Sequence, residues 1–114
     1  MTPDDLRGLV QHLPSVTEDT KWDHLCFLVG AKIFALAGYT PDSPVCFKVS
    51  GEDFAILTDR EDIRQAPHFA RGQWVVVDHP RALTRLEWKE YLSKSYALVA
   101  EKLPKKTRKE LGLL

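Results

Sequence analysis

The side chains that could carry out chemistry are scattered along this 114-residue sequence. Its four histidines are His12, His24, His68 and His79. They fit neither H-x-x-x-H nor H-E-x-x-H spacing, so we expect no zinc site. Asp23-His24 and Asp78-His79 are adjacent pairs, but neighbours on a strand point to opposite faces and form no dyad. Because glycine-rich phosphate loops are also absent, we predict a protein that is not an enzyme and has no cofactor.

Two lysines, Lys32 and Lys48, lie within apolar runs that are typical of strands. A lysine in such a run must extend to solvent along its stem or pair with an anion. One reading is therefore a sheet face that is open to water. The other is a groove for an anionic ligand or a nucleic-acid backbone, in which Phe34 and Trp74 join the two lysines.

A loop with basic and aromatic residues runs into the strand that begins at Trp74, with Arg64 before it and Arg71 within it. Arginine binds phosphates and base edges, and aromatic rings stack or insert, so such a loop is typical of a DNA-contacting wing. The tail adds five cations within eight residues. We expect phosphate contacts from Arg64, Arg71, Lys94, Lys102, Lys105, Lys106, Arg108 and Lys109. The alternative for the tail is a solvated helix end, where cations are favourable.

The composition is that of one ordinary domain. Apolar residues make up 44% of the chain and charged residues 28%, which argues against disorder. The longest apolar runs are far shorter than the roughly 20 residues of a membrane span, and the chain does not begin with a signal-like segment. Cys26 and Cys46 lack CxxC spacing and are predicted to be buried, reduced thiols. We therefore predict a cytoplasmic protein with no membrane partner.

The formal net charge is zero, but the two halves of the chain differ in sign. Residues 1–62 contain five Lys/Arg and eleven Asp/Glu, and residues 63–114 contain eleven and five. If the fold separates the halves, a basic face can attract an anionic polymer. If the halves interleave, their charges neutralise each other.

Hydrophobic periodicity predicts a helix over residues 2–13 and then a hairpin over residues 24–38. Gly30-Ala31 fits a type II′ turn, and in that register Phe27 faces Phe34. One face of the hairpin is then Phe27, Val29, Lys32, Phe34 and Leu36. The other face is Cys26, Leu28, Ile33, Ala35 and Ala37.

Further along, the sequence predicts a strand at 45–50, a helix at 51–59, an irregular segment at 60–72 and a strand at 73–78. A capping box of Thr84 and Glu87 begins a long helix. Its apolar stripe is Trp88, Leu92, Ser95, Val99 and Leu103. Short connections leave no room for parallel crossovers, so we predict a single two-layer α+β domain over 1–114. An antiparallel sheet of about four or five strands is packed by the N-terminal helix and the long C-terminal helix.

Several short motifs follow one another along the chain. They are Trp22, "VGAKIFAL" at 29–36, "FKV" at 47–49, "APHF" and "GQWVVVD" within 66–78, and "SYALVAEKLPKK" at 95–106. In order and spacing they resemble the MmcQ/YjbR family of small bacterial proteins. The resemblance implies an α+β domain similar to secretion-chaperone-like folds and a DNA-binding protein of the double-wing type.

The resemblance also bears on the predicted groove. The residues on motif positions are Lys32, Phe34, Lys48, Trp74, Ser95 and Tyr96. Ser95 has a structural alternative, because a small residue in the helical stripe allows close packing on the sheet. Our leading hypothesis is a non-enzymatic protein that binds DNA. The alternative is an adaptor that uses an apolar sheet face to bind a protein partner, a second copy of the chain or a small anion.

Overall fold

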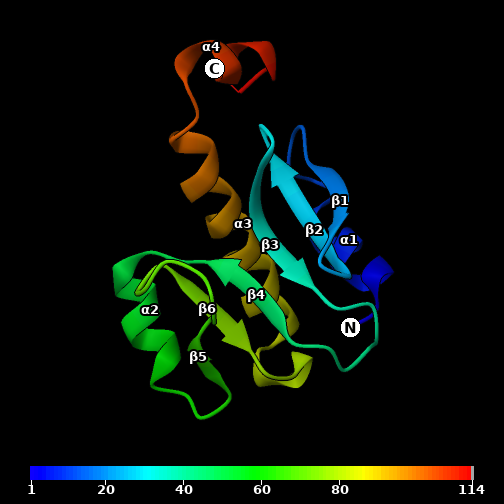
Figure 1. Ribbon diagram of the computed structural model, residues 1–114, viewed down its shortest axis with the longest axis vertical. Coiled ribbons are helices and arrows are strands. Elements are labelled where there is room, and N and C mark those ends of the chain that lie inside the picture. Colours follow the sequence, from blue (N-terminus) through cyan, green and yellow to red (C-terminus); the bar gives the residue numbers. More distant parts are fainter. Residues whose placement is uncertain (114) are drawn as a thin grey trace.

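A six-stranded antiparallel sheet forms one layer of the molecule, and helices pack on one of its faces (Figure 1). The computed structural model describes residues 1–113. The strands are β1 (Thr17–Lys21), β2 (His24–Val29), β3 (Lys32–Ala37), β4 (Val45–Lys48), β5 (Ile63–Gln65) and β6 (Trp74–Val77). They are ordered β1-β2-β3-β4-β6-β5. The helices are α1 (Pro3–Val10), α2 (Gly51–Thr58), the 3-10 turn η1 (Pro80–Ala82), α3 (Arg85–Glu101) and α4 (Lys105–Glu110).

The predicted two-layer α+β class is confirmed. The sheet has one strand more than the upper estimate, because β5 lies at its edge within the segment predicted to be irregular. Its three residues, Ile63–Gln65, pair with β6. A strand this short carries too little alternation to be recognised by periodicity. None of the helices in residues 1–113 has the length and apolar character needed to cross a membrane.

Helix α3 packs on the sheet through the face that its sequence predicts. Thr84 Oγ1 accepts a hydrogen bond from the Glu87 amide, and the Glu87 carboxylate accepts one from the Thr84 amide. All members of the stripe are buried: Trp88, Leu92, Ser95, Val99 and Leu103. Trp88 Nε1 donates to the Pro80 carbonyl at 2.7 Å, and its ring meets Phe47 edge to face at 5.8 Å between centroids. The stripe thus supplies much of the core between the two layers.

Ser95 lies where α3 meets β4, and its side chain is fully buried. Its hydroxyl is within hydrogen-bond distance of the Lys48 carbonyl, at 2.5 Å, and of the Tyr91 carbonyl, at 2.9 Å. A small residue there lets the helix approach the strand, and its hydroxyl satisfies a strand carbonyl that would otherwise be buried without a partner. The structure therefore favours the packing role of Ser95 over a place in a ligand groove.

The β2–β3 hairpin departs from the predicted register beyond its first two pairs. Phe27 pairs with Ala35 and not with Phe34, because a β-bulge interrupts the ladder between Phe27 and Leu28. The extra residue reverses the alternation of β3 from that point. Leu36 therefore lies on the face away from the helices, whereas Ala35 and Ala37 face them. The predicted face assignment of these three residues is wrong for this reason.

The turn of this hairpin is type I′ and not the predicted type II′. The φ angles of Gly30 and Ala31 are 57° and 65°, and a positive φ at both central residues defines type I′. The turn also packs tightly on Leu103, two residues beyond α3, since a Cβ added to Gly30 would come within 2.6 Å of the Leu103 side chain. Glycine is thus favoured at position 30, and the turn is held against the residues that follow α3.

An ion pair joins the end of α2 to the start of α3 and makes stability depend on pH. Arg60 Nη2 lies 2.6 Å from Glu87 Oε2, and this hydrogen bond, followed by that from the Thr84 amide, lowers the pKa of Glu87 to about 2. In the unfolded chain this carboxyl titrates at about 4.3. The ion pair therefore contributes fully to stability above that pH, and its contribution is lost as the pH falls toward 2. When the pH is lowered from about 6 to about 2.5, the free energy of unfolding of the wild type, measured in urea, should fall by roughly 1 kcal/mol more than that of Glu87→Gln. Equal losses in the two proteins would contradict this assignment.

Candidate functional site

The face of the sheet away from the helices, which we call the open face, has an apolar cluster of its own. Its buried members are Cys26, Leu28, Leu36, Ala66, Trp74 and Val76, and Ile33, Cys46 and Phe69 pack against them. The buried residues of α1, α2 and α3 all belong to the core on the opposite face. Within residues 1–113, the loop that precedes β6 folds over part of the open face, through Ala66 and Phe69. An apolar sheet surface without a covering layer of helices is a candidate binding surface.

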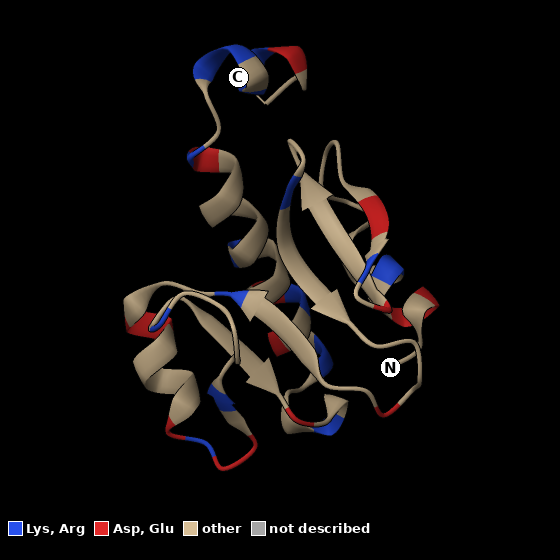
Figure 2. Cartoon of the chain, in the orientation of Figure 1, with Lys and Arg blue, Asp and Glu red and all other residues tan. Residues whose placement is uncertain are grey.

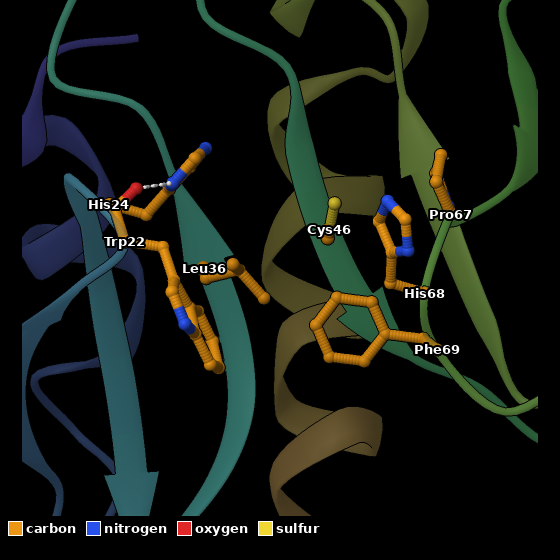
Figure 3. A pocket seen from close by; sticks show the side chains of 7 residues that line it. All are labelled: Trp22, His24, Leu36, Cys46, Pro67, His68 and Phe69. Carbon is orange, nitrogen blue, oxygen red and sulfur yellow. Dashed lines mark hydrogen bonds between the residues drawn. The ribbon is translucent and has the colours of Figure 1, made fainter.

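A groove of about 510 Å³ lies on the open face. Figure 3 shows Trp22 and His24 on one side, Pro67, His68 and Phe69 on the other, and Leu36 and Cys46 between them. On the first side, Trp22 lies in the β1–β2 connection and His24 begins β2. The second side comes from the loop before β6, while Leu36 and Cys46 belong to β3 and β4. Its volume is within the usual range for sites that bind small molecules, about 300–1,000 Å³.

Both walls of the groove are held in place by specific contacts. Trp22 has a φ of 51°, and its carbonyl accepts a 2.6 Å hydrogen bond from His24 Nδ1. On the other wall, the Phe69 ring stacks on Trp74 at 4.4 Å with an interplanar angle of 26°. The Trp22 side chain itself is 72% exposed. One wall therefore presents the exposed indole of Trp22, and the other presents the Phe69 ring, which is held in place by stacking on Trp74.

Gln65 holds the loop that forms the second wall. Its Nε2 donates to the carbonyls of Ala66 (2.9 Å) and Phe69 (3.3 Å), and its Oε1 accepts from the Gly72 amide at 2.9 Å. Sequence reasoning missed Trp22, His24, Leu36, Cys46 and Gln65 as parts of this site; Trp22 entered only as a motif residue. Gln65 could have been identified as a side-chain amide at the start of a loop, where the backbone groups of the loop need hydrogen-bond partners.

The two thiols of the open face are not activated. Cys26 and Cys46 each pair with Leu36, which lies on the strand between them, so they are two strand spacings apart and form no disulfide. Burial raises the pKa of both thiols, that of Cys46 to about 11. Within residues 1–113, no group of three His, Cys, Asp or Glu side chains is arranged to hold a metal ion.

Two of the predicted DNA contacts are neutralised by acids that the fold brings beside them. Arg64 Nη2 lies 3.2 Å from Asp78 Oδ1. Lys94 Nζ lies 3.6 Å from Asp53 of α2 and 3.5 Å from Glu90, and Asp53 is the main cause that raises its pKa. These pairs leave Arg64 and Lys94 less able to attract phosphates than their sequence positions imply.

Of the other six predicted contacts, five follow the end of α3. The Gly30-Ala31 turn packs on Leu103, which brings the start of β3 to the α3–α4 junction, and Lys102 is close enough to lower the pKa of Lys48. Figure 2 shows blue segments at the start of β3, directly after the red end of α3, and along most of α4. We call this set the cationic end: Lys32, Lys48, Lys102, Lys105, Lys106, Arg108 and Lys109. Considering residues 1–113, no member forms an ion pair with an acid. Arg71 is exposed in the loop before β6, and it also has no acidic ion-pair partner within residues 1–113.

Lys48 connects the cationic end to the groove. It pairs with Trp74 in the ladder, and it follows Cys46 by two residues, so its side chain leaves β4 on the open face. Burial, and then the charge of Lys102, lower its pKa. The structure thus places a partly desolvated lysine on the same face as the aromatic groove, with Lys102 near enough to lower its pKa.

The groove predicted from motif positions does not form as one surface. Lys48 and Trp74 lie on the open face, but Phe34 and Tyr96 are buried among the helices, with their rings edge to face at 5.6 Å. Tyr96 donates its hydroxyl to the Pro14 carbonyl at 2.6 Å. Ser95 is likewise in the core, and Lys32 is opposite Val29 on the helix side. The bulge in β3 and the close approach of α3 separate these residues from Trp74.

Comparisons with known proteins agree with the fold. A family model described as YjbR matches residues 11–98. The chain is similar to protein DR2400 of Deinococcus radiodurans, described by the domain DUF419, with 30% identity and a TM-score of 0.88 over 99% of this chain and 89% of that one. It is also similar in fold to a Pseudomonas syringae protein, structural genomics target PsR293, with 20% identity and a TM-score of 0.69. That similarity covers 86% of this chain and 98% of the other. None of the curated proteins compared with the chain matches it.

Proposed function

The chain belongs to the YjbR family, and we propose that it binds DNA, without catalysing a reaction, through the cationic end and the adjoining open face. One observation carries the proposal. The seven cations of this end have no acidic partner within residues 1–113, whereas Arg64 and Lys94 are paired with acids. Clustered, unpaired cations bind phosphates and release the counterions condensed on DNA.

The state of the candidate nucleophiles supports the non-catalytic part of the proposal. Ser95 is bound to backbone carbonyls in the core, and the thiol of Cys46 stays protonated at neutral pH because burial raises its pKa to about 11. A thiol acts as a nucleophile as the thiolate. The free cysteines also support a reducing compartment, and the 30% identical relative is bacterial, so we propose a bacterial cytoplasm.

A salt titration of DNA binding tests the proposal. Fluorescence anisotropy of a labelled DNA should show binding at low salt that weakens linearly on a log-log plot. The expected slope is about −0.9 per contacted phosphate of a duplex and about −0.7 per phosphate of a single strand. With three or more contacts, the affinity should fall at least about tenfold between about 50 and about 200 mM salt. No binding at low salt would refute DNA binding, and binding that salt does not weaken would refute the assignment of the cationic end as the binding surface.

The groove favours a second candidate, an adaptor that binds a protein segment or a second copy of the chain. Its support is the exposed Trp22 indole beside an apolar sheet surface. Apolar contacts are not weakened by moderate salt, so the same titration separates the two candidates. Sedimentation at increasing protein concentration would reveal a dimer, and a strict monomer would exclude self-association through this face.

A further inference from the structure

We propose that the groove between Trp22 and Phe69 receives an unpaired base of a single-stranded nucleic acid, with the adjoining phosphate at Lys48. This inference rests on the proposed function and specifies the form of nucleic acid that the site takes. It uses three features of the open face: two facing aromatic walls, an apolar floor, and a lysine at one end of that floor.

The aromatic walls provide stacking surfaces. Trp22 is 72% exposed although it is the kind of side chain that proteins usually bury, and its backbone is held in a left-handed conformation. Phe69 lies across the groove from it (Figure 3). The Phe69 ring also stacks on Trp74. Every base has a π face, so stacking on aromatic side chains binds single strands with little regard to sequence.

The floor of the groove favours an uncharged group over a charged one. Leu36 and Cys46 are apolar, and the polar side chains that line the groove within residues 1–113 are His24 and His68, with no lysine, arginine or carboxylate among them. A base is the uncharged, planar part of a nucleotide, whereas its phosphate needs a cation. Lys48 follows Cys46 by two residues on the same face, a separation of about 7 Å along the strand, within the reach of one nucleotide.

The groove also distinguishes a single strand from a duplex. In a duplex the bases are stacked and paired, and a base must be extruded at an energetic cost before it can enter a protein pocket. A single strand offers its bases without that cost. The unpaired cations that continue from Lys48 to Lys102 and α4 provide a path for the following phosphates.

The test uses the fluorescence of the protein and a variant of Trp22. Trp74 and Trp88 are buried, so a base that stacks on Trp22 should quench the exposed part of the emission. Trp22→Asn removes the ring while keeping the left-handed backbone, which asparagine tolerates. Its matched control is Leu86→Asn, which removes a 75% exposed apolar side chain from α3 outside the groove.

We expect an oligothymidylate to bind more tightly than a duplex of equal length and to quench the emission. Trp22→Asn should weaken single-strand binding about tenfold, while duplex binding and the Leu86→Asn variant stay unchanged. Equal affinity for both DNA forms with no effect of Trp22→Asn would overturn this inference and leave DNA binding intact. Thymidine monophosphate binding as tightly as the oligomer would also overturn it, in favour of a free nucleotide. Absence of binding to either DNA would refute the proposed function itself.

Discussion

Replacing Lys102, Lys105 and Lys106 together with serine is expected to weaken DNA binding about 10²-fold or more at about 0.1 M salt. At that salt concentration each neutralised phosphate contributes close to about one logarithmic unit of affinity through counterion release. All three side chains are exposed, and Lys102 lies near Lys48. The slope of the salt titration should also become shallower by about 2 to 3.

A matched control removes the same number of positive charges from a surface that lies away from the cationic end. Arg81, Arg85 and Lys89 are exposed as well, but they lie on η1 and in the first turns of α3. The 17 residues of α3 span about 25 Å, so this triple serine variant leaves the cationic end unchanged. Its affinity and salt slope should stay close to those of the wild type. If both triple variants weaken binding equally, attraction follows total charge and the assigned surface is wrong.

Trp88→Ala is expected to destabilise the fold by about 3–5 kcal/mol, the usual cost of removing a large buried aromatic side chain. Trp88 is 2% exposed, meets Phe47 edge to face, and satisfies the Pro80 carbonyl through its indole nitrogen. The substitution leaves a cavity between α3 and β4 and removes that hydrogen bond. Urea unfolding followed by circular dichroism measures the loss, and a change below about 1 kcal/mol would contradict the assigned core.

Trp22→Asn is the matched comparison for stability as well as for binding. It removes the same kind of side chain from a position that is 72% exposed, so the free energy of unfolding should change by at most about 0.5 kcal/mol. The two substitutions are thus expected to have different effects: Trp88→Ala lowers the stability of the fold, and Trp22→Asn weakens binding in the groove. A large loss of stability in Trp22→Asn would show that its ring packs in the structure and is not free to stack on a ligand.

Local patterns predicted the elements well where one signal dominated. The capping box of Thr84 and Glu87 and the stripe that begins at Trp88 define α3, because helical spacing and cap chemistry act within a few residues. The same reasoning placed Ser95 in the stripe, where its hydroxyl is used in packing. The faces of β3 could not be predicted in the same way. A single bulged residue, Phe34, reverses the alternation, and its ring packs against Tyr96 from a distant helix.

The candidate site depended still more on distant contacts. Trp22 and Phe69 are far apart in the sequence and share a groove only because the sheet brings β3 and β4 together between them. The number of cations free to attract phosphate could not be predicted from the sequence either. Whether Arg64 or Lys94 attracts phosphate depends on Asp78 and Asp53, acids that the fold supplies. Short-range sequence patterns contain no information about such partners.

The sequence by itself determined the α+β class, the family, the main helices and strands, and the presence of a basic tail, since these follow from local periodicity, capping and motif order. Only the tertiary structure decided which residues face one another. It buried Phe34, Ser95 and Tyr96, opened a groove beside Trp22, and left Lys48 and the cations near α4 without acidic partners within residues 1–113. The physical reason is that burial and ion pairing are set by through-space neighbours, which a linear pattern does not specify.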